Sequence, residues 1–343
     1  MYYHLITSEG DIISSNLQKE CESCLETCQS IGIIAPDCKV DSSKKRYGIL
    51  SNKKGTTFLC CSKTKTTKLF REKIEAFSQC IPGIVQLKSN LVKEIASTEQ
   101  QRVNRLVHNL TTINAHNIQE LYDLVPQDSI TRDIKNQIST IKKEISNDLD
   151  KAARAFLRIV KHNIHLKTEF SVYKKLFREK PNLNFGLHPI RKIILNVLHT
   201  FFMDFSDKDV IVKVNEYDGR INIDYETMHV ALYHIIENAA KYVRPKTNLF
   251  INFKENTHTL KVEFVMESLF IEELEKDRIY EEGYSGLNVK NIGKQGEGIG
   301  MYRILRLVKL NNAKFETIRG ETVSKLHGIK FANNKFILEF QLN

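Results

Sequence analysis

The middle of the chain, from Ile84 to Leu176, contains no glycine, and its only proline is Pro126. Glycine and proline are the residues that most often interrupt helices, so this stretch predicts two long helices joined by a turn at Pro126. Apolar residues recur along the second predicted helix with gaps of three and four, which is typical of a coiled coil or helical bundle. These seam residues are Ile130, Ile134, Ile138, Ile141, Ile145, Leu149, Ala152, Phe156 and Ile159. One hairpin cannot bury such a seam, so we expect a homodimer that forms a four-helix bundle.

The composition is that of a globular protein of two or three domains, with 343 residues, 41% hydrophobic and 27% charged. No apolar run is long enough to span a bilayer. The N-terminus lacks the basic start and apolar stretch of a signal peptide, and we expect a cytoplasmic protein.

The chain carries 51 Lys and Arg against 41 Asp and Glu, for a formal net charge of +10. Such a charge permits a nucleic-acid partner. The basic residues are interspersed with acidic ones, however, and we do not expect nucleic-acid binding. A basic regulator that binds nucleic acid is a less favoured interpretation of the chain.

Changes in the pattern of predicted helices and strands divide the chain into three predicted domains. Residues 1–82 combine strand and helix patterns and predict a small α/β input or docking domain that ends at Pro82-Gly83. Residues 84–178 form the helical hairpin, and residues 179–343 alternate helices and strands in an α+β pattern. Within the first domain, residues 45–61 predict a hairpin that turns at positions 53–55.

A cysteine cluster in the first domain allows two interpretations. Cys21, Cys24 and Cys28 fall on one face of a helix predicted over residues 16–32, and Cys38 follows ten residues later. Four thiolates at such spacing are able to bind zinc. Cysteine is also a common small apolar core residue, and we favour core packing over a metal site.

The strongest local signal near the C-terminus is a glycine-rich turn, Gly296-Glu297-Gly298-Ile299-Gly300, directly before a predicted helix. Glycines allow close approach of a phosphate to the backbone, and the N-terminus of a helix favours an anion. No strand directly precedes this turn, so it is not a dinucleotide-binding fingerprint.

About sixty residues earlier, a predicted helix carries a polar stripe beside its apolar face. His234, Asn238, Lys241 and Tyr242 lie at i, i+4, i+7 and i+8, a spacing that allows them to bind Mg²⁺ and a triphosphate. The loop between this helix and the glycine-rich turn is long, and long loops often act as lids.

Taken together, these motifs resemble the histidine-kinase branch of the GHKL ATPase superfamily. Residues 234–242 resemble its N box, 279–286 its F box, 296–304 its second glycine box and 334–342 its last strand. The resemblance implies a Bergerat-type α/β sandwich that binds ATP and Mg²⁺, with Asn238 as the Mg²⁺ ligand. It implies nucleotide contacts from His234, Asn238, Lys241, Tyr242, Glu267, Lys294, Gly296, Gly298 and Gly300.

The family also implies a phosphoacceptor histidine on the first helix of the hairpin. His108, with Thr112 four residues later, is similar to that motif, and His116 is the weaker candidate. The expected activity is autophosphorylation of His108, within or across the dimer, and transfer of the phosphoryl group to a response-regulator-like partner.

Three positions depart from the family pattern. Asn109 replaces the acidic residue that follows the phosphoacceptor, so the local general base is missing and slow or absent phosphotransfer is expected. His234 replaces the first Asn or Glu of the N box, so rapid ATP hydrolysis is not expected. Glu267 stands where an Asp normally accepts a hydrogen bond from the adenine amino group. The departures at Asn109 and His234 favour the alternative of a nucleotide-gated interaction module, a pseudokinase switch without phosphotransfer. Thr112 and the position of the hairpin favour the kinase.

Overall fold

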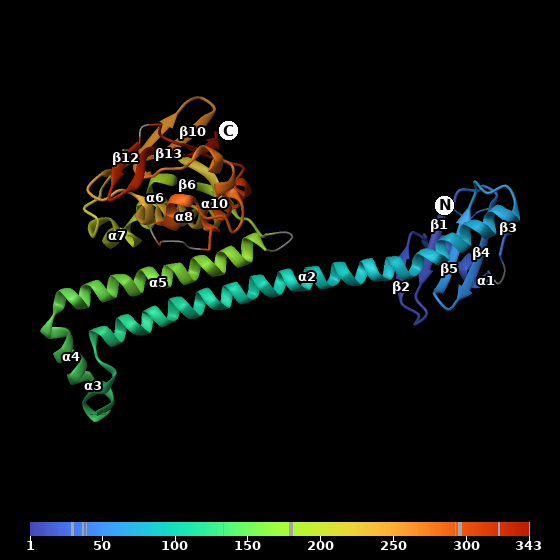
Figure 1. Cartoon of the computed structure of the whole chain (residues 1–343), viewed down its shortest axis with the longest axis horizontal. Coiled ribbons are helices and arrows are strands. Elements are labelled where there is room, and N and C mark those ends of the chain that lie inside the picture. The colour runs from blue at the N-terminus through green and yellow to red at the C-terminus, as the bar shows by residue number, and fades with distance from the viewer. Residues whose placement is uncertain are drawn as a thin grey trace. The chain divides into compact units, whose positions relative to one another are not determined.

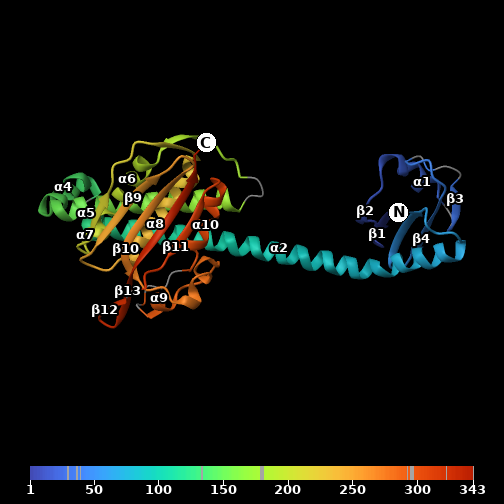
Figure 2. The same ribbon diagram turned by 90° about the horizontal axis from the view of Figure 1, so that it is seen from above.

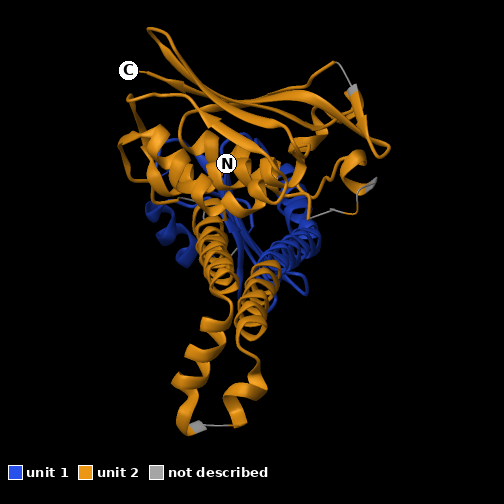
Figure 3. Ribbon diagram, turned by 90° about the vertical axis from the view of Figure 1, so that its left-hand side faces the viewer, with its two compact units in different colours: residues 1–104 blue, residues 105–343 orange. Residues whose placement is uncertain are grey.

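The computed structural model describes residues 1–28, 31–35, 38, 40–132, 134–177, 181–291, 293, 297–321 and 323–342 (Figure 1). The chain divides into two compact units, residues 1–104 and 105–343, which Figure 3 distinguishes by colour. None of the described helices is both long enough and apolar enough to span a membrane.

The first unit is built on an antiparallel five-stranded sheet in the order β2-β1-β5-β4-β3. Phe70 and Ile74 of helix α2 (Thr67–Leu124) pack against Leu59 and Cys61 of the sheet and form a small core. The hairpin predicted over residues 45–61 is present and turns at Lys53 and Lys54. The strands are β1 (Tyr2–Ile6), β2 (Ile12–Ser15), β3 (Ile33–Ala35), β4 (Lys45–Asn52) and β5 (Gly55–Cys61).

The cysteine-bearing helix is shorter than predicted. It consists of a 3₁₀ turn, η1 (Lys19–Cys21), followed by α1 (Glu22–Thr27), and it ends because Cys28 takes an extended conformation. Cys21 and Cys28 are buried, as core packing requires. In the described part of the chain, no group of three or more His, Cys, Asp and Glu side chains is placed to hold a metal ion.

Helix α2 (Thr67–Leu124) is continuous across Pro82 and Gly83, so the predicted break at this point is wrong. Proline removes one helical hydrogen bond and glycine lowers helix propensity. Packing outweighs both effects here, because Ile74 and Ile81 on the same helix are almost completely buried, at 0% and 1% exposed.

The second helix of the hairpin is divided, where the seam predicted one helix. Asp148 leaves the helical conformation (φ −150°, ψ 88°), and its carboxylate accepts a hydrogen bond from the Lys151 N–H at 2.8 Å, which starts a new helix. Seam residues Ile138, Leu149 and Phe156 remain 73%, 68% and 67% exposed, so a single chain leaves part of the seam exposed. The segments are α3 (Gln127–Arg132), η2 (Ile134–Asn136), α4 (Gln137–Asn147) and α5 (Leu149–Leu176).

The C-terminal part of the second unit is an α/β sandwich, which together with the hairpin confirms the predicted fold class. Its sheet has the order β11-β13-β10-β9-β7, with β12 beside β13, and only the β7–β9 pair is parallel. Three helices, α6 (Ile190–Thr200), α8 (Tyr225–Tyr242) and α10 (Gly300–Leu310), cover one face of the sheet (Figures 1 and 2). The strands are β7 (Ile211–Val214), β9 (Asn248–Glu255), β10 (Thr259–Leu269), β11 (Lys314–Ile318), β12 (Val323–Leu326) and β13 (Ile329–Gln341).

Shorter elements complete the sandwich. A two-stranded sheet pairs β6 with β8, and α9 lies within the long loop before the glycine-rich turn. Their bounds are β6 (Phe185–Pro189), α7 (Phe202–Ser206), β8 (Arg220–Asp224), η3 (Glu273–Glu275), η4 (Arg278–Tyr280) and α9 (Leu287–Asn291).

Asp224 fixes the start of α8 and therefore the position of the polar stripe. Its carboxylate accepts hydrogen bonds from the backbone N–H and the hydroxyl of Thr227, both at 2.8 Å, and from the Asn184 N–H at 2.7 Å. The Asp224 N–H in turn donates to Asn311 at the end of α10, which ties the two helices together. Burial alone raises the pKa of Asp224, but the hydrogen bonds from Asn184 and Thr227 bring that pKa below its usual value.

Candidate functional site

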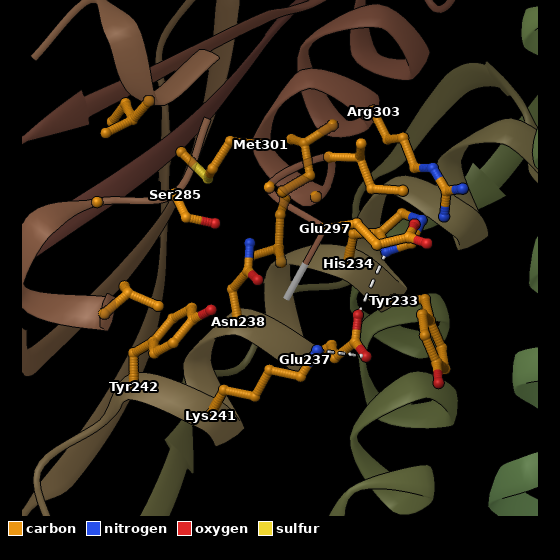
Figure 4. A pocket seen from close by; sticks show the side chains of 18 of the residues that line it. Tyr233, His234, Glu237, Asn238, Lys241, Tyr242, Ser285, Glu297, Met301 and Arg303 are labelled. Carbon is orange, nitrogen blue, oxygen red and sulfur yellow. Dashed lines mark hydrogen bonds and ion pairs between the residues drawn. The ribbon is translucent and has the colours of Figure 1, made fainter. Parts of the chain in front are cut away.

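The second unit contains a cavity of about 570 Å³ between the hairpin and the sandwich. Asn238 of α8 and the turn Gly298–Gly300 both line it (Figure 4). An ideal Cβ on Gly300 would lie 3.4 Å from both side-chain atoms, Oδ1 and Nδ2, of Asn238, so a glycine allows the two elements to approach closely. The two strongest sequence motifs therefore adjoin each other in the lining of one cavity.

The polar stripe of α8 points into this cavity and includes a residue that sequence reasoning missed. His234, Asn238, Lys241 and Tyr242 all line the cavity, and so does Glu237 (Figure 4). The Lys241 ammonium lies 2.9 Å from the Glu237 carboxylate, whose other oxygen is 3.4 Å from His234 Nδ1. Burial alone raises the pKa of Glu237, but the His234 hydrogen bond and the Lys241 charge bring that pKa well below its usual range.

His234 is the most deeply buried member of the stripe, at 2% exposed. An ionised Glu237 carboxylate only accepts hydrogen bonds, so His234 Nδ1 is the donor in their contact. His234 Nε2 has no hydrogen-bond partner among the residues that the structure describes. A buried polar atom without a partner is costly, and it is a candidate contact for a bound polar ligand.

The glycine-rich turn is shaped to bind an anion at the start of α10. Gly298 has a φ of +68°, which favours glycine, and its carbonyl accepts a hydrogen bond from the Gly283 N–H at 3.2 Å. The N-cap residue Ile299 makes no side-chain cap hydrogen bond, and Gly298, Ile299 and Gly300 at this end of α10 line the cavity. The first N–H groups of a helix point out of its N-terminus, which favours an anion there. Lys294 and Gly296, which the resemblance also implicates, lie outside the described residues.

The structure does not place Glu267 in the cavity, contrary to the expectation for an adenine-binding carboxylate. The Glu267 carboxylate pairs with Arg244 at 2.6 Å and also accepts a hydrogen bond from the Ser324 hydroxyl. Successive side chains of a strand point to opposite faces, so its neighbours Met266 and Ser268 line the cavity instead. Met266 and Ser268 therefore line the stretch of β10 from which the Glu267 carboxylate was expected to point.

The wall next to Met266 is largely apolar. Residues Leu269, Phe270 and Ile271 continue the lining beyond the end of β10. An apolar slot of this kind suits a flat ring.

Both histidine candidates of the hairpin line the same cavity. His108 and Thr112 of α2 are exposed on their helix and border the cavity, and His116 lies one further turn along. The His116 ring lies 5.8 Å, between ring centroids, from that of His162 on α5. The geometry thus brings His108 and Thr112 together with the α8 stripe and the glycine-rich turn.

A buried ion pair at the back of the cavity was not foreseen. Glu169 of α5 accepts two hydrogen bonds from Arg303 of α10, at 2.5 and 3.1 Å, and the two side chains are 3% and 8% exposed. Burial alone raises the pKa of Glu169, but the charge and hydrogen bonds of Arg303 bring that pKa below its usual value. The sequence holds no local signal for this pair, because the two residues are 134 positions apart.

Searches with protein-family models and against curated protein sequences find no match. Solved structures do resemble the fold. A mycobacterial sensor histidine kinase, MprB, matches at 12% identity and a TM-score of 0.39, over 46% of this chain and 97% of its own. The Acinetobacter baumannii histidine kinase AdeS matches at 12% identity and a TM-score of 0.39, over 69% and 97%. The histidine kinase ThkA, in complex with the response regulator TrrA, matches at 13% identity and a TM-score of 0.39, over 100% and 96%.

Proposed function

We propose that this chain is an ATP-dependent, histidine-kinase-like signalling protein that phosphorylates its own His108. One observation carries the proposal: His108, Asn238 and the Gly298–Gly300 turn line a single cavity. A phosphoacceptor, a metal-binding amide and a phosphate-binding helix terminus are the three parts that such a transfer needs.

The residues fit Mg–ATP in chemical type. The Asn238 amide oxygen is a ligand that Mg²⁺ accepts, and the uncapped start of α10 suits the phosphates. The Lys241 ammonium and the Tyr242 hydroxyl border the same space and are able to contact the nucleotide. Bound Mg²⁺ would supply neutralisation of the charge on the phosphate oxygens.

The chemical step is a displacement at the γ-phosphorus. The lone pair of a His108 ring nitrogen forms a bond to phosphorus as the bond from phosphorus to the bridging oxygen of ADP breaks, and ADP leaves with that electron pair. The phosphoryl group then passes to an aspartate of a response-regulator-like partner, which this chain does not include.

We further propose that the active form is a homodimer. The exposed seam residues Ile138, Leu149 and Phe156 belong to the hairpin helices, and a second hairpin would cover them. In such a dimer, ATP bound to one chain would phosphorylate His108 either of the same chain or of the partner chain.

A second candidate function is a nucleotide-gated interaction module without phosphotransfer. Two observations favour it: Asn109 replaces a carboxylate beside His108, and the Glu267 carboxylate pairs with Arg244 and does not line the cavity. In this case nucleotide would bind between α8 and α10 and change the surface that the chain presents to a partner.

Incubation of the full chain with Mg²⁺ and γ-labelled ATP separates the two functions. A histidine kinase acquires an acid-labile label, and His108→Ala abolishes it. The matched control His116→Ala removes the neighbouring histidine of the same cavity and should keep the label. Nucleotide binding by calorimetry without any label would support the interaction module, and loss of label only in His116→Ala would reassign the phosphoacceptor.

A further inference from the structure

We infer that Glu169 is a positioning residue for the phosphoacceptor and acts on His108 through the side chain of Asn109. The inference rests on the proposed function, because it concerns the same histidine. Asn109 Nδ2 lies 3.2 Å from Glu169 Oε2, and His108 Nδ1 lies 3.5 Å from Asn109 Oδ1. Arg303 holds the other end of this chain of contacts through its two hydrogen bonds to Glu169.

The direction of each hydrogen bond follows from the chemistry of the groups. The Glu169 carboxylate, ionised beside the Arg303 guanidinium, only accepts hydrogen bonds. The Asn109 amide therefore turns its NH₂ group toward Glu169, and its oxygen faces His108. An amide oxygen also only accepts, so the proton of a neutral His108 ring is held at Nδ1.

This arrangement leaves the lone pair on His108 Nε2, the ring nitrogen that lies farther from the helix backbone. A neutral imidazole has two tautomers, and the partner of one nitrogen decides which tautomer is present. When Nε2 forms its bond to phosphorus, the ring becomes positively charged and keeps its Nδ1 proton. The Asn109 oxygen, oriented by Glu169, faces that developing charge.

The contacts also supply what the sequence lacked beside His108. A carboxylate at position 109 would accept the Nδ1 proton directly, and the chain has Asn109 there. Glu169 of α5 contributes the missing carboxylate. It does not contact His108 directly, and the Asn109 side chain connects Glu169 to His108. Because Arg303 is in the first turn of α10, the same contacts join His108 to the helix that begins at the glycine-rich turn.

The first test needs no nucleotide. In the full chain with ¹⁵N-labelled histidine, long-range ¹H–¹⁵N correlation distinguishes the two ring tautomers, and His108→Ala assigns the signal. We expect the Nδ1–H tautomer for His108 in the native chain, and a mixture of tautomers in Asn109→Ala. A His108 ring that is protonated at Nε2 in the native chain would overturn the inference.

The second test measures the initial rate of labelling at saturating ATP. Asn109→Ala leaves the Glu169–Arg303 pair intact and should lower the rate by about ten- to a hundredfold, the usual effect of losing a supporting hydrogen bond, while the affinity for ATP stays within twofold. Glu169→Gln should lower it similarly. The exchange Asn109→Asp with Glu169→Gln again places a carboxylate and an amide side by side, and it should restore most of the rate.

Glu120→Gln is the matched control, since Glu120 pairs with Arg158 between the same two helices at 3.2 Å and does not line the cavity. Its rate should equal that of the native chain. Unchanged labelling in Asn109→Ala would refute the positioning role even if His108 is phosphorylated. Nucleotide binding with no label in any variant would refute the proposed function, and the tautomer measurement would still decide the contact.

Discussion

Replacing Gly298 with alanine tests whether the glycine-rich turn is as constrained as its geometry indicates. Gly298 has a φ of +68°, where an L-residue costs about 1–2 kcal/mol. Its Cβ would lie 2.6 Å from backbone atoms of Gly283 and Tyr284, so that segment must shift, at a further cost of about 1–3 kcal/mol. We expect Gly298→Ala to lower the free energy of unfolding by about 2–5 kcal/mol, measured by urea denaturation of the full chain.

Gly300→Ala is the control, two positions along the same turn. Its φ is not in the left-handed region, and the atoms nearest to its Cβ, at 3.4 Å, belong to the Asn238 side chain. Alanine also favours the first turn of α10, so stability should be unchanged or slightly raised. Affinity for Mg–ATP should nevertheless fall, because the methyl group crowds Asn238. Equal stability of the Gly298→Ala variant and the native chain, or a larger loss in Gly300→Ala, would refute this account of the turn.

Four further outcomes follow from the structure. Asp224→Ala removes the N-cap of α8 and should lower the free energy of unfolding by about 1–2 kcal/mol at pH 7; because the folded pKa of Asp224 is below its unfolded value of about 3.9, this contribution is present above pH 4 and should disappear in denaturation curves as pH falls further. Phe156→Asn on the exposed seam should shift a dimer toward monomer in light scattering, and an unchanged mass would argue against this face as the interface. Glu267→Gln should leave ATP affinity within twofold, and GTP should compete within tenfold of ATP in a displacement assay, since Glu267 faces away from the cavity. Replacing the buried pair with Glu169→Met and Arg303→Leu together should leave stability unchanged or raise it by about 1–4 kcal/mol, whereas Arg303→Leu alone should lower it by about 3–5 kcal/mol.

Much of the sandwich could be predicted because its helices and strands are specified locally. The helix that carries Asn238 has apolar periodicity and an aspartate at its start, and the structure forms it over Tyr225–Tyr242. The hairpin was less predictable, because two local signals conflicted with longer-range effects. Pro82 indicated a break in α2 that packing overrides. The apolar spacing predicted one continuous second helix, which Asp148 divides.

The parts of the site that a single local motif supplies could be predicted from the sequence. The adjacency of Asn238 and the Gly298–Gly300 turn follows from two local patterns that the fold brings together. Glu267 shows the limit of such reasoning, since a shift of one residue in a strand moves a side chain to the other face of the sheet. The sequence around Glu267 contains no glycine that would mark where the strand ends. The register of β10 is set by its pairing with β13 and β9, which the local sequence does not specify.

The buried charges of the cavity argue that this region was shaped for a ligand and not for stability. A buried ion pair such as Glu169–Arg303 adds little stability compared with apolar side chains of the same size. Here it lies at the only described contact that connects His108, through Asn109, to the helix behind the glycine-rich turn. Glu237 likewise pairs with Lys241 and with His234 on α8. Glu169 and Glu237 both line the cavity, and each orients a cationic side chain there. Transfer of a charged group requires such an arrangement, because the orienting groups must be fixed before the reactants meet.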